Sequence, residues 1–190
     1  KELQKKSPDI RYHISSGNAE YVLEYLDKGL IDFGLLFGAV DTQKYESLPL
    51  PTRDTWGVLM RRDAPLAQKS HITPEDLWDK PLIISHQRGD APYLSQWMKK
   101  DLSSLRVVAT YNLVYNASLL VDEGLGYALC LDKLINTAES NLCFRPFDPP
   151  LEAPACIVWK KYQMFSKAAD AFLRSLHGML EPDAAPGGTE

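Results

Sequence analysis

The sequence predicts an α/β protein built from two small lobes. Apolar runs of strand length alternate with amphipathic helical segments, and polar loops follow several of the strands. Proline-containing turns near residues 62–65 and 146–150 indicate two places where the chain crosses between lobes. This order of elements places a ligand beyond the carboxyl ends of the strands.

The first sixty residues predict strands at 10–15, 31–37 and 55–61 and helices at 1–6 and 18–28. The first strand rests on an alternation of apolar and polar residues. The second is an almost continuous apolar run, which is typical of burial on both faces in a parallel sheet. Asn18 is placed to cap the helix between them and Gly29 to end it, so we expect a right-handed βαβ unit. Residues 38–51 predict a polar, turn-rich connection.

The middle of the chain predicts strands at 82–85, 106–110 and 127–131 and helices at 73–80, 94–102 and 116–123. Thr73 and the Pro and acidic residues that follow it form a helix-start signature. Asn116 is a suitable N-cap for the third helix, and Gly124 is suited to the position after its end. Backbone N–H groups at the start of such a helix are unpaired and can bind an anion or another polar ligand.

The last third predicts a short helix capped by Asp132, strands at 142–147 and 155–160, and an amphipathic helix from Ser166 to Leu180. Residues 183–190 are rich in Pro and Gly, and their composition predicts a disordered tail.

Composition excludes several classes of protein. The formal charge of −4 and the pI of about 5.6 argue against a nucleic-acid-binding surface on this chain. Three cysteines without C-x-x-C spacing fit buried, reduced thiols, and residues 1–10 do not resemble a signal peptide. No stretch of 18 apolar residues occurs, so we expect a cytoplasmic protein that does not enter the membrane.

Catalysis finds little support in the sequence. The four histidines are far apart, and neither a metal-binding H-x-x-x-H pattern nor a G-x-S-x-G nucleophile motif occurs. The glycines at 124 and 126 fit a helix end and a close-packing point better than a nucleotide loop. We therefore expect no enzymatic activity, no cofactor and no metal.

Four segments in order resemble the effector-binding domain of LysR-type transcriptional regulators. They are the helix end and strand around Leu26–Leu36, the turn Arg62–Ala67, the segment Ile72–Ile83, and the segment Leu120–Leu129, LVDEGLGYAL, which is similar to that family's L-V-A-A-G-L-G-I-A-L. Together with the closing strand and helix, the resemblance spans nearly the whole chain.

The resemblance implies a periplasmic-binding-protein-like fold of two α/β lobes that clamp an effector. Lobe I would comprise residues 1–60 and 148–190, and lobe II residues 61–147. The family's usual first strand and most of its first helix have no counterpart before Lys1, which would leave an open place in the sheet of lobe I.

The candidate effector site consists of residues in loops after strands: Phe37, Gly38, Ser85, His86, Gln87, Tyr115 and Asn116. Hydroxyl, imidazole and amide groups in one loop can orient a carboxylate or another polar group. Arg88 fits a solvated turn as well as a pocket. Tyr115 fits either stacking on a ligand or packing between lobes, and for Tyr111 core packing is favoured.

The resemblance also implies partners. A small polar or anionic effector would bind between the lobes, and the full-length regulator would be a homodimer or tetramer that binds promoter DNA through an N-terminal winged helix-turn-helix. In such a dimer, Ala91–Ser104 would supply the contact from lobe II. A transporter's solute-binding protein shares the fold and is the alternative; an enzyme on the same fold would need a catalytic constellation that the sequence does not contain.

Overall fold

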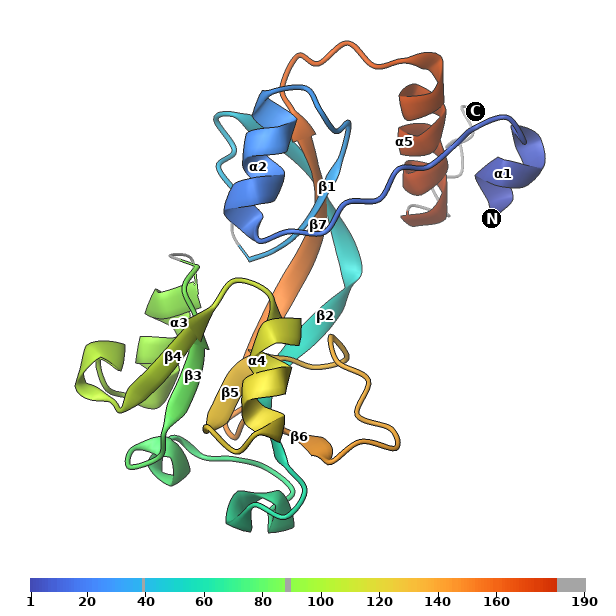
Figure 1. Cartoon of the computed structure of the whole chain (residues 1–190). Helices are drawn as coiled ribbons and strands as arrows, with labels where there is room; N and C mark the ends of the chain where they lie inside the picture. The colour runs from blue at the N-terminus through green and yellow to red at the C-terminus, as the bar shows by residue number, and fades with distance from the viewer. Residues whose placement is uncertain (39, 88–89, 181–190) are drawn as a thin grey trace, which may run out of the picture.

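The computed structural model describes residues 1–38, 40–87 and 90–180, whose elements gather into two groups (Figure 1). We call residues 1–49 and 156–180 the upper group and residues 56–153 the lower group. Strands β2 (Tyr45–Arg61) and β7 (Glu152–Lys160) run through both groups and connect them. The predicted tail at 183–190 lies outside the described residues.

The upper group is a small antiparallel sheet with helix α2 (Ala19–Asp27) on one face. Its strand order is β1 (Gly34–Phe37), β7, β2. The core beneath α2 consists of Leu26, Leu36, Tyr45, Cys156 and Val158. Helix α1 (Glu2–Lys6) lies against α5 (Lys167–Leu180), at the side of this sheet.

The predicted cap of α2 is confirmed. The Asn18 side chain accepts a hydrogen bond from the backbone N–H of Tyr21 at 3.0 Å. Gly29 follows the helix with φ +67°, a conformation that glycine adopts without steric cost. Local sequence signals therefore determine both ends of this helix.

The predicted βαβ unit is wrong. Residues 10–15 are extended but not hydrogen-bonded as a strand, and Ile14 is 90% exposed. The second strand is shorter than predicted, pairs antiparallel with β7, and alternates between buried and exposed residues. Alternating residues permit a strand, but a strand also needs a neighbouring backbone, and within the described residues none pairs with 10–15.

Strand β2 includes part of the segment that was predicted to be a turn-rich connection. Its seventeen residues pair first with β7 and then with β5 and β6. Pro49 and Pro51 are tolerated because the register with β7 shifts between Pro49 and Arg53, where the missing N–H groups break no regular ladder. The sequence prediction failed because residues 38–51 are polar and turn-rich, and pairing with β7 extends the strand into them.

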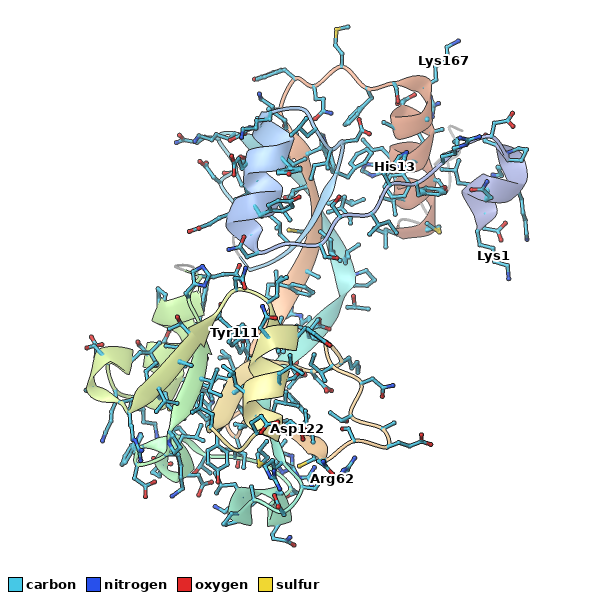
Figure 2. The ribbon with its side chains drawn as sticks, in the orientation of Figure 1. Lys1, His13, Arg62, Tyr111, Asp122 and Lys167 are labelled. Carbon is cyan, nitrogen blue, oxygen red and sulfur yellow. The ribbon has the colours of Figure 1, made fainter. Side chains whose placement is uncertain are left out.

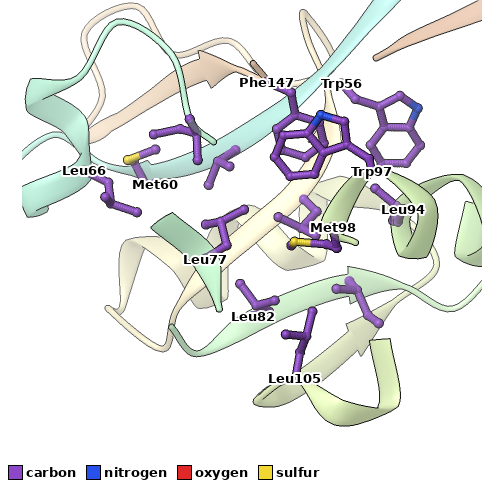
Figure 3. Packing of buried hydrophobic residues seen from close by; sticks show 14 of the residues in the cluster. Trp56, Met60, Leu66, Leu77, Leu82, Leu94, Trp97, Met98, Leu105 and Phe147 are labelled. Carbon is purple, nitrogen blue, oxygen red and sulfur yellow. The ribbon is translucent and has the colours of Figure 1, made fainter. Parts of the chain in front are cut away.

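The lower group is a mixed sheet covered on both faces. Strand β3 (Leu82–Ser85) pairs in parallel with β4 (Val107–Tyr111) and β5 (Tyr127–Leu131), while β2 pairs antiparallel with β5 and β6 (Leu142–Pro146). All four residues of β3 are buried, as the apolar run predicted. Helix α3 (Asp90–Met98) packs into one core cluster (Figure 3), and α4 (Val114–Asp122) contributes to the cluster on the other face.

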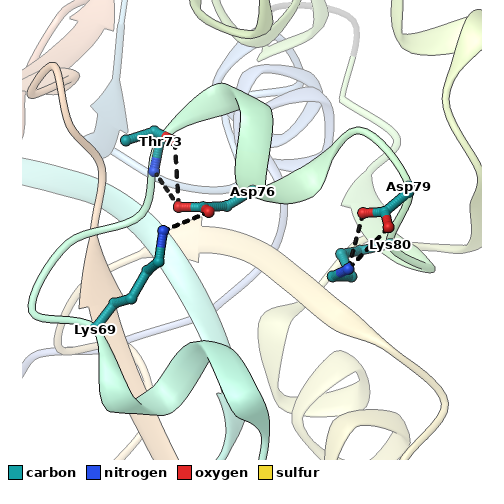
Figure 4. Close-up of polar contacts among 5 residues, drawn as sticks. All are labelled: Lys69, Thr73, Asp76, Asp79 and Lys80. Atoms are coloured by element: carbon teal, nitrogen blue, oxygen red, sulfur yellow. Dashed lines mark hydrogen bonds and ion pairs between the residues drawn. The ribbon is translucent and has the colours of Figure 1, made fainter.

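Three short 3-10 helices complete the lower group: η1 (Pro65–Gln68), η2 (Pro74–Leu77) and η3 (Leu102–Ser104). The predicted helix start at Thr73 is confirmed for η2. The Asp76 carboxylate accepts from the Thr73 backbone N–H at 3.0 Å and forms an ion pair with Lys69 (Figure 4). Leu102, predicted in the same helix as Trp97, belongs instead to η3, because α3 ends at Met98.

The predicted helix after Asp132 is wrong. Residues 132–141 form turns, and the Asp132 carboxylate accepts from the backbone N–H of Lys133 at 2.8 Å. The guanidinium of Arg62 donates to the carbonyls of Thr137 and Ser140, which holds this loop against the end of β2. These side-chain bonds satisfy carbonyl groups that a helix would otherwise use.

The connection between the groups is anchored by aromatic side chains. Trp56 is buried; its backbone N–H donates to the Leu151 carbonyl, and its carbonyl accepts from the Phe147 N–H. Trp97 stacks on Phe147 with a centroid separation of 3.7 Å and donates from Nε1 to the Pro149 carbonyl at 2.6 Å (Figure 3). Two tryptophans, Trp56 and Trp97, therefore lie at the connection between the groups.

Candidate functional site

The upper edge of the lower sheet is formed by the ends of two parallel strands. Ser85 is the last residue of β3 and lies in register with Tyr111, the last residue of β4. Figure 2 shows Tyr111 at the side of the lower group that faces the upper group. Polar residues that follow these strands are therefore presented towards the space between the groups.

The loop after β3 is attached to the end of β4. The His86 backbone N–H donates to the Tyr111 carbonyl at 3.0 Å, and His86 Nδ1 lies 2.9 Å from the same oxygen. A carbonyl only accepts, so Nδ1 carries the proton, a tautomer that we assign from this contact. In the neutral ring, Nε2 is then an acceptor. The exposed imidazole is thus oriented by the sheet edge.

Ser85 is a buried polar residue at this edge, with 7% of its surface exposed. Its Oγ accepts from the Gln87 backbone N–H at 3.2 Å, and the hydroxyl hydrogen can donate elsewhere. This bond tightens the loop and sets the direction in which Gln87 leaves the strand. Arg88, which the sequence placed in the same loop, lies outside the described residues.

Gln87 joins the lower group to the upper group. Its side-chain Oε1 accepts from the backbone N–H of Ala19, the first residue of α2, at 2.9 Å. Sequence analysis placed Gln87 at the site but missed Ala19 opposite it. The available signal was Asn18: a capped helix start lies next to an unpaired N–H that another group can bind.

The candidate residues from the upper group follow β1. Phe37 is partly exposed, and Gly38 has φ +89° with its N–H donating to the Pro154 carbonyl at 2.9 Å. This positive φ requires glycine or a strained residue. The bond attaches the turn after β1 to β7, one of the two connecting strands. Ala39, in the same predicted loop, lies outside the described residues.

The predicted cap at Asn116 is wrong. Helix α4 begins at Val114, its N-cap is Leu113 without a side-chain hydrogen bond, and Asn116 is therefore the third helical residue. Strand β4 continues to Tyr111, so only two residues remain for the turn, and the helix starts early. Asn112 orders that turn by accepting from the Leu113 N–H at 2.9 Å.

The two tyrosines near this turn differ in environment. Tyr111 is buried and its hydroxyl donates to the Leu129 carbonyl at 2.6 Å, which confirms the prediction that it packs in the core. Tyr115 is 65% exposed, on the solvent side of α4. The structure thus brings Ser85, His86 and Gln87 together at one edge, whereas Tyr115 and Asn116 lie on the exposed surface of the adjoining helix.

Backbone dipoles contribute to the electrostatic character of this edge. Helix α2 of the upper group and helices α3 and α4 of the lower group begin around the space between the groups (Figure 1). The N-terminus of a helix carries a partial positive charge, which favours anions and acceptor oxygens. Within residues 1–38, 40–87 and 90–180, no group of three His, Cys, Asp or Glu residues is arranged to hold a metal ion.

The fold places the chain among mixed α/β, periplasmic-binding-protein-like domains. It is similar to the effector binding domain of QuiR in complex with shikimate, with a TM-score of 0.81, 18% identity, and coverage of 95% of this chain and 88% of that chain. It is also similar to the CcmR regulatory domain of Synechocystis PCC6803 in complex with 2-PG, with a TM-score of 0.77, 20% identity and coverage of 95% and 88%. At this identity, the likeness shows the fold alone.

The particular family follows from the sequence. The LysR substrate binding domain matches residues 1–181, and the chain belongs to that family, whose members are regulatory rather than enzymatic domains. One curated relative is "Uncharacterized HTH-type transcriptional regulator YvbU" of Bacillus subtilis (strain 168), which is 25% identical over 174 residues. That match covers 90% of this chain but 58% of the relative. Among the described residues, no helix is both long and apolar enough to cross a membrane.

Proposed function

We propose that this chain senses a small polar or anionic effector, bound between the upper and lower groups, as the regulatory domain of a LysR-type transcription factor. The observation that carries the proposal is the edge formed by Ser85, His86 and Gln87, which faces the N-terminus of α2. Hydrogen-bond donors and acceptors from both groups meet there. A ligand that contacts both groups stabilises one relative arrangement of them over others.

In this proposal the upper group corresponds to lobe I and the lower group to lobe II. The boundaries differ from the predicted 60/61 and 147/148, because Trp56, Val58 and Met60 pack in the core of the lower group together with Ala153. The proposed crossings therefore lie within β2 just before Trp56 and within β7 just after Ala153. Paired strands that pass between lobes allow small rotations while preserving most of their hydrogen bonds.

The chemistry of the edge supports a ligand with several oxygen atoms. The Ser85 hydroxyl and the Gln87 amide nitrogen can donate, and His86 Nε2 can accept from a ligand hydroxyl. The helix N-termini add partial positive charge. Two similar structures, the CcmR regulatory domain and the effector binding domain of QuiR, are complexes with the small molecules 2-PG and shikimate, which supports a small-molecule effector here. Phe37, Gly38, Tyr115 and Asn116 remain candidate contributors at its margins.

The whole protein is proposed to extend beyond this chain. The curated relative is an HTH-type regulator of which the chain spans 58%, which supports an additional DNA-binding region that contacts promoter DNA. We further propose a homodimer or tetramer in which residues 91–104 contribute a contact, and a cytoplasmic location. The outer edge of β1 and the exposed Tyr12 and Ile14 support a further strand that would pair there in the longer protein.

A thermal-shift screen of small carboxylates, amino acids and aromatic acids tests the sensing function. A ligand that binds only the folded domain raises its apparent stability with concentration. For a confirmed ligand, Ser85→Ala should weaken affinity about 3- to 10-fold, the loss expected for one neutral hydrogen bond. Ser70→Ala is the matched control, because Ser70 is exposed and follows η1, away from the edge.

Two results would contradict the proposal. One is that no compound of these classes stabilises the domain at millimolar concentration. The other is that Ser85→Ala and Asn116→Ala both bind a confirmed ligand with unchanged affinity while circular dichroism shows an intact fold. In the second case the ligand binds elsewhere on the domain.

A further inference from the structure

We propose that Gln87 is a latch that holds the upper and lower groups together in the ligand-free domain. Its Oε1 accepts from the Ala19 N–H at 2.9 Å across 68 residues of sequence. Within the described residues, no other hydrogen bond joins α2 to the lower group. The inference concerns the arrangement of the groups and does not require the effector proposed above.

Ala19 offers a donor that its own helix cannot satisfy. It is the first residue of α2, and the first N–H groups of a helix have no intrahelical acceptor. The Asn18 side chain serves the Tyr21 N–H, so it does not compete for Ala19. Gln87 thus binds a first-turn N–H of α2 from the opposite group. The helix dipole strengthens this bond, because an acceptor oxygen lies at its positive end.

The acceptor is held by the sheet and not by a free loop. The Gln87 backbone N–H donates to Ser85 Oγ, and the preceding His86 makes two contacts with the Tyr111 carbonyl. The anchors are Ser85 and Tyr111, the last residues of the paired parallel strands β3 and β4, and both residues are buried. The position of the side chain is therefore tied to the lower group, and separation of the groups has to break the bond to Ala19.

Helix α3 extends from the latch to the connection between the groups. It begins three residues after Gln87, and near its other end Trp97 donates to Pro149 and stacks on Phe147. Phe147 and Pro149 lie in the segment that leads into β7 (Figure 3). One short helix thus links the latch to a crossing strand.

The latch can be removed from either side without loss of the fold. Gln87→Ala removes the acceptor. Ala19→Pro removes the donor at the first helical position, where proline is well tolerated. Asn18 already has φ −74° and ψ 171°, an extended conformation that suits a residue before proline. Gln87→Glu retains an acceptor and adds negative charge at the positive end of α2, so it should strengthen the latch.

Spin labels on Lys28→Cys in the upper group and Gln96→Cys in α3 report the separation of the groups. Both native residues are exposed, whereas the three native cysteines are buried and should escape labelling. Pulsed electron–electron double resonance then gives the distribution of distances between the two spin labels in the ligand-free domain. Gln68→Ala, an exposed substitution in η1, is the matched control and should leave the distribution unchanged.

The expected result is an increase of about fivefold in the ratio of open to closed molecules for Gln87→Ala and for Ala19→Pro, with no further increase in the double variant. Gln87→Glu should lower that ratio. The proposal is overturned if either single variant matches the parent distribution, or if their effects add. Circular dichroism confirms folding of each variant. Because no ligand is used, failure of the latch is distinguishable from failure of the Ser85 affinity test.

Discussion

Gly126→Ala is expected to be among the most destabilising single-methyl changes in this domain. Gly126 precedes β5, and a Cβ added there would lie 3.1 Å from the carbonyl carbon of Pro81 and closer still to its oxygen. That oxygen accepts from the Tyr127 N–H at 2.9 Å, in the bond that starts the pairing of β3 with β5. Neither partner is a flexible side-chain end, so relief of the overlap requires movement of backbone.

The magnitude follows from two costs and one gain. Overpacking against a fixed backbone costs about 1–3 kcal/mol, and a weakened Tyr127–Pro81 hydrogen bond costs about 1 kcal/mol more. Replacement of glycine restricts the unfolded chain, which offsets about 0.4–1 kcal/mol. The free energy of unfolding should therefore fall by about 1–3.5 kcal/mol for Gly126→Ala.

Two other glycines serve as controls. At Gly124 and Gly178 an added Cβ meets no atom within 4 Å, but Gly124 has φ +79°. Gly124→Ala should cost about 1 kcal/mol from the backbone conformation alone, and Gly178→Ala, inside α5, should stabilise by about 0.5–1 kcal/mol. Equilibrium urea denaturation measures all three. A loss below about 0.5 kcal/mol for Gly126→Ala would refute the steric argument, since that value lies within ordinary surface effects.

Three further predictions concern charges and thiols. Burial alone raises the pKa of Asp76, but the Lys69 ammonium and the Thr73 N–H outweigh it and hold that pKa below its ordinary value of 3.8. Its stabilising contribution is therefore present above pH 3.8 and is lost as pH falls through the lower pKa of the folded state. Asp76→Asn should cost about 1 kcal/mol at pH 7 and much less near pH 2, as denaturation at both pH values will show. Burial raises the pKa of Cys130 to about 12, and all three cysteines are buried. Ellman's reagent at pH 8 should therefore react with these thiols only after unfolding. Rapid reaction of the folded domain would contradict this prediction. Asp122, at the negative end of α4, has a buried Oδ1 to which no described residue donates a hydrogen bond. Asp122→Ala should therefore raise the free energy of unfolding by about 0.5–1 kcal/mol, measured in urea.

Local signals predicted what depends on a few neighbouring residues. The cap at Asn18, the helix start at Thr73 and the buried strand Leu82–Ser85 were all found where the sequence indicated. Gly124 also ends its helix in the predicted left-handed conformation. The helix ends are decided by contacts within one turn, and the apolar run at 82–85 predicts a buried strand even though its partners β4 and β5 are distant in the sequence.

Pairing between strands that are distant in the sequence decided which segments became strands and where they end. The segment 10–15 has the period of a strand but no neighbouring backbone in the described structure, and β2 continues through two prolines because β7 pairs beside it. Asn116 lies inside α4 because pairing with β3 extends β4 to Tyr111. Hydrogen bonds of a sheet depend on the partner strand, which short-range patterns do not specify.

At the candidate site, too, the local sequence determined some features and the tertiary structure determined others. The sequence by itself determined that polar side chains follow β3 at Ser85, His86 and Gln87, and it carried the motifs of the LysR substrate-binding family. Only the tertiary structure decided what faces them: the N-terminus of α2, with the Ala19 N–H in reach of Gln87. The physical reason is that the two strands connecting the groups set their relative position, and a side-chain bond across 68 residues leaves no periodicity in the sequence.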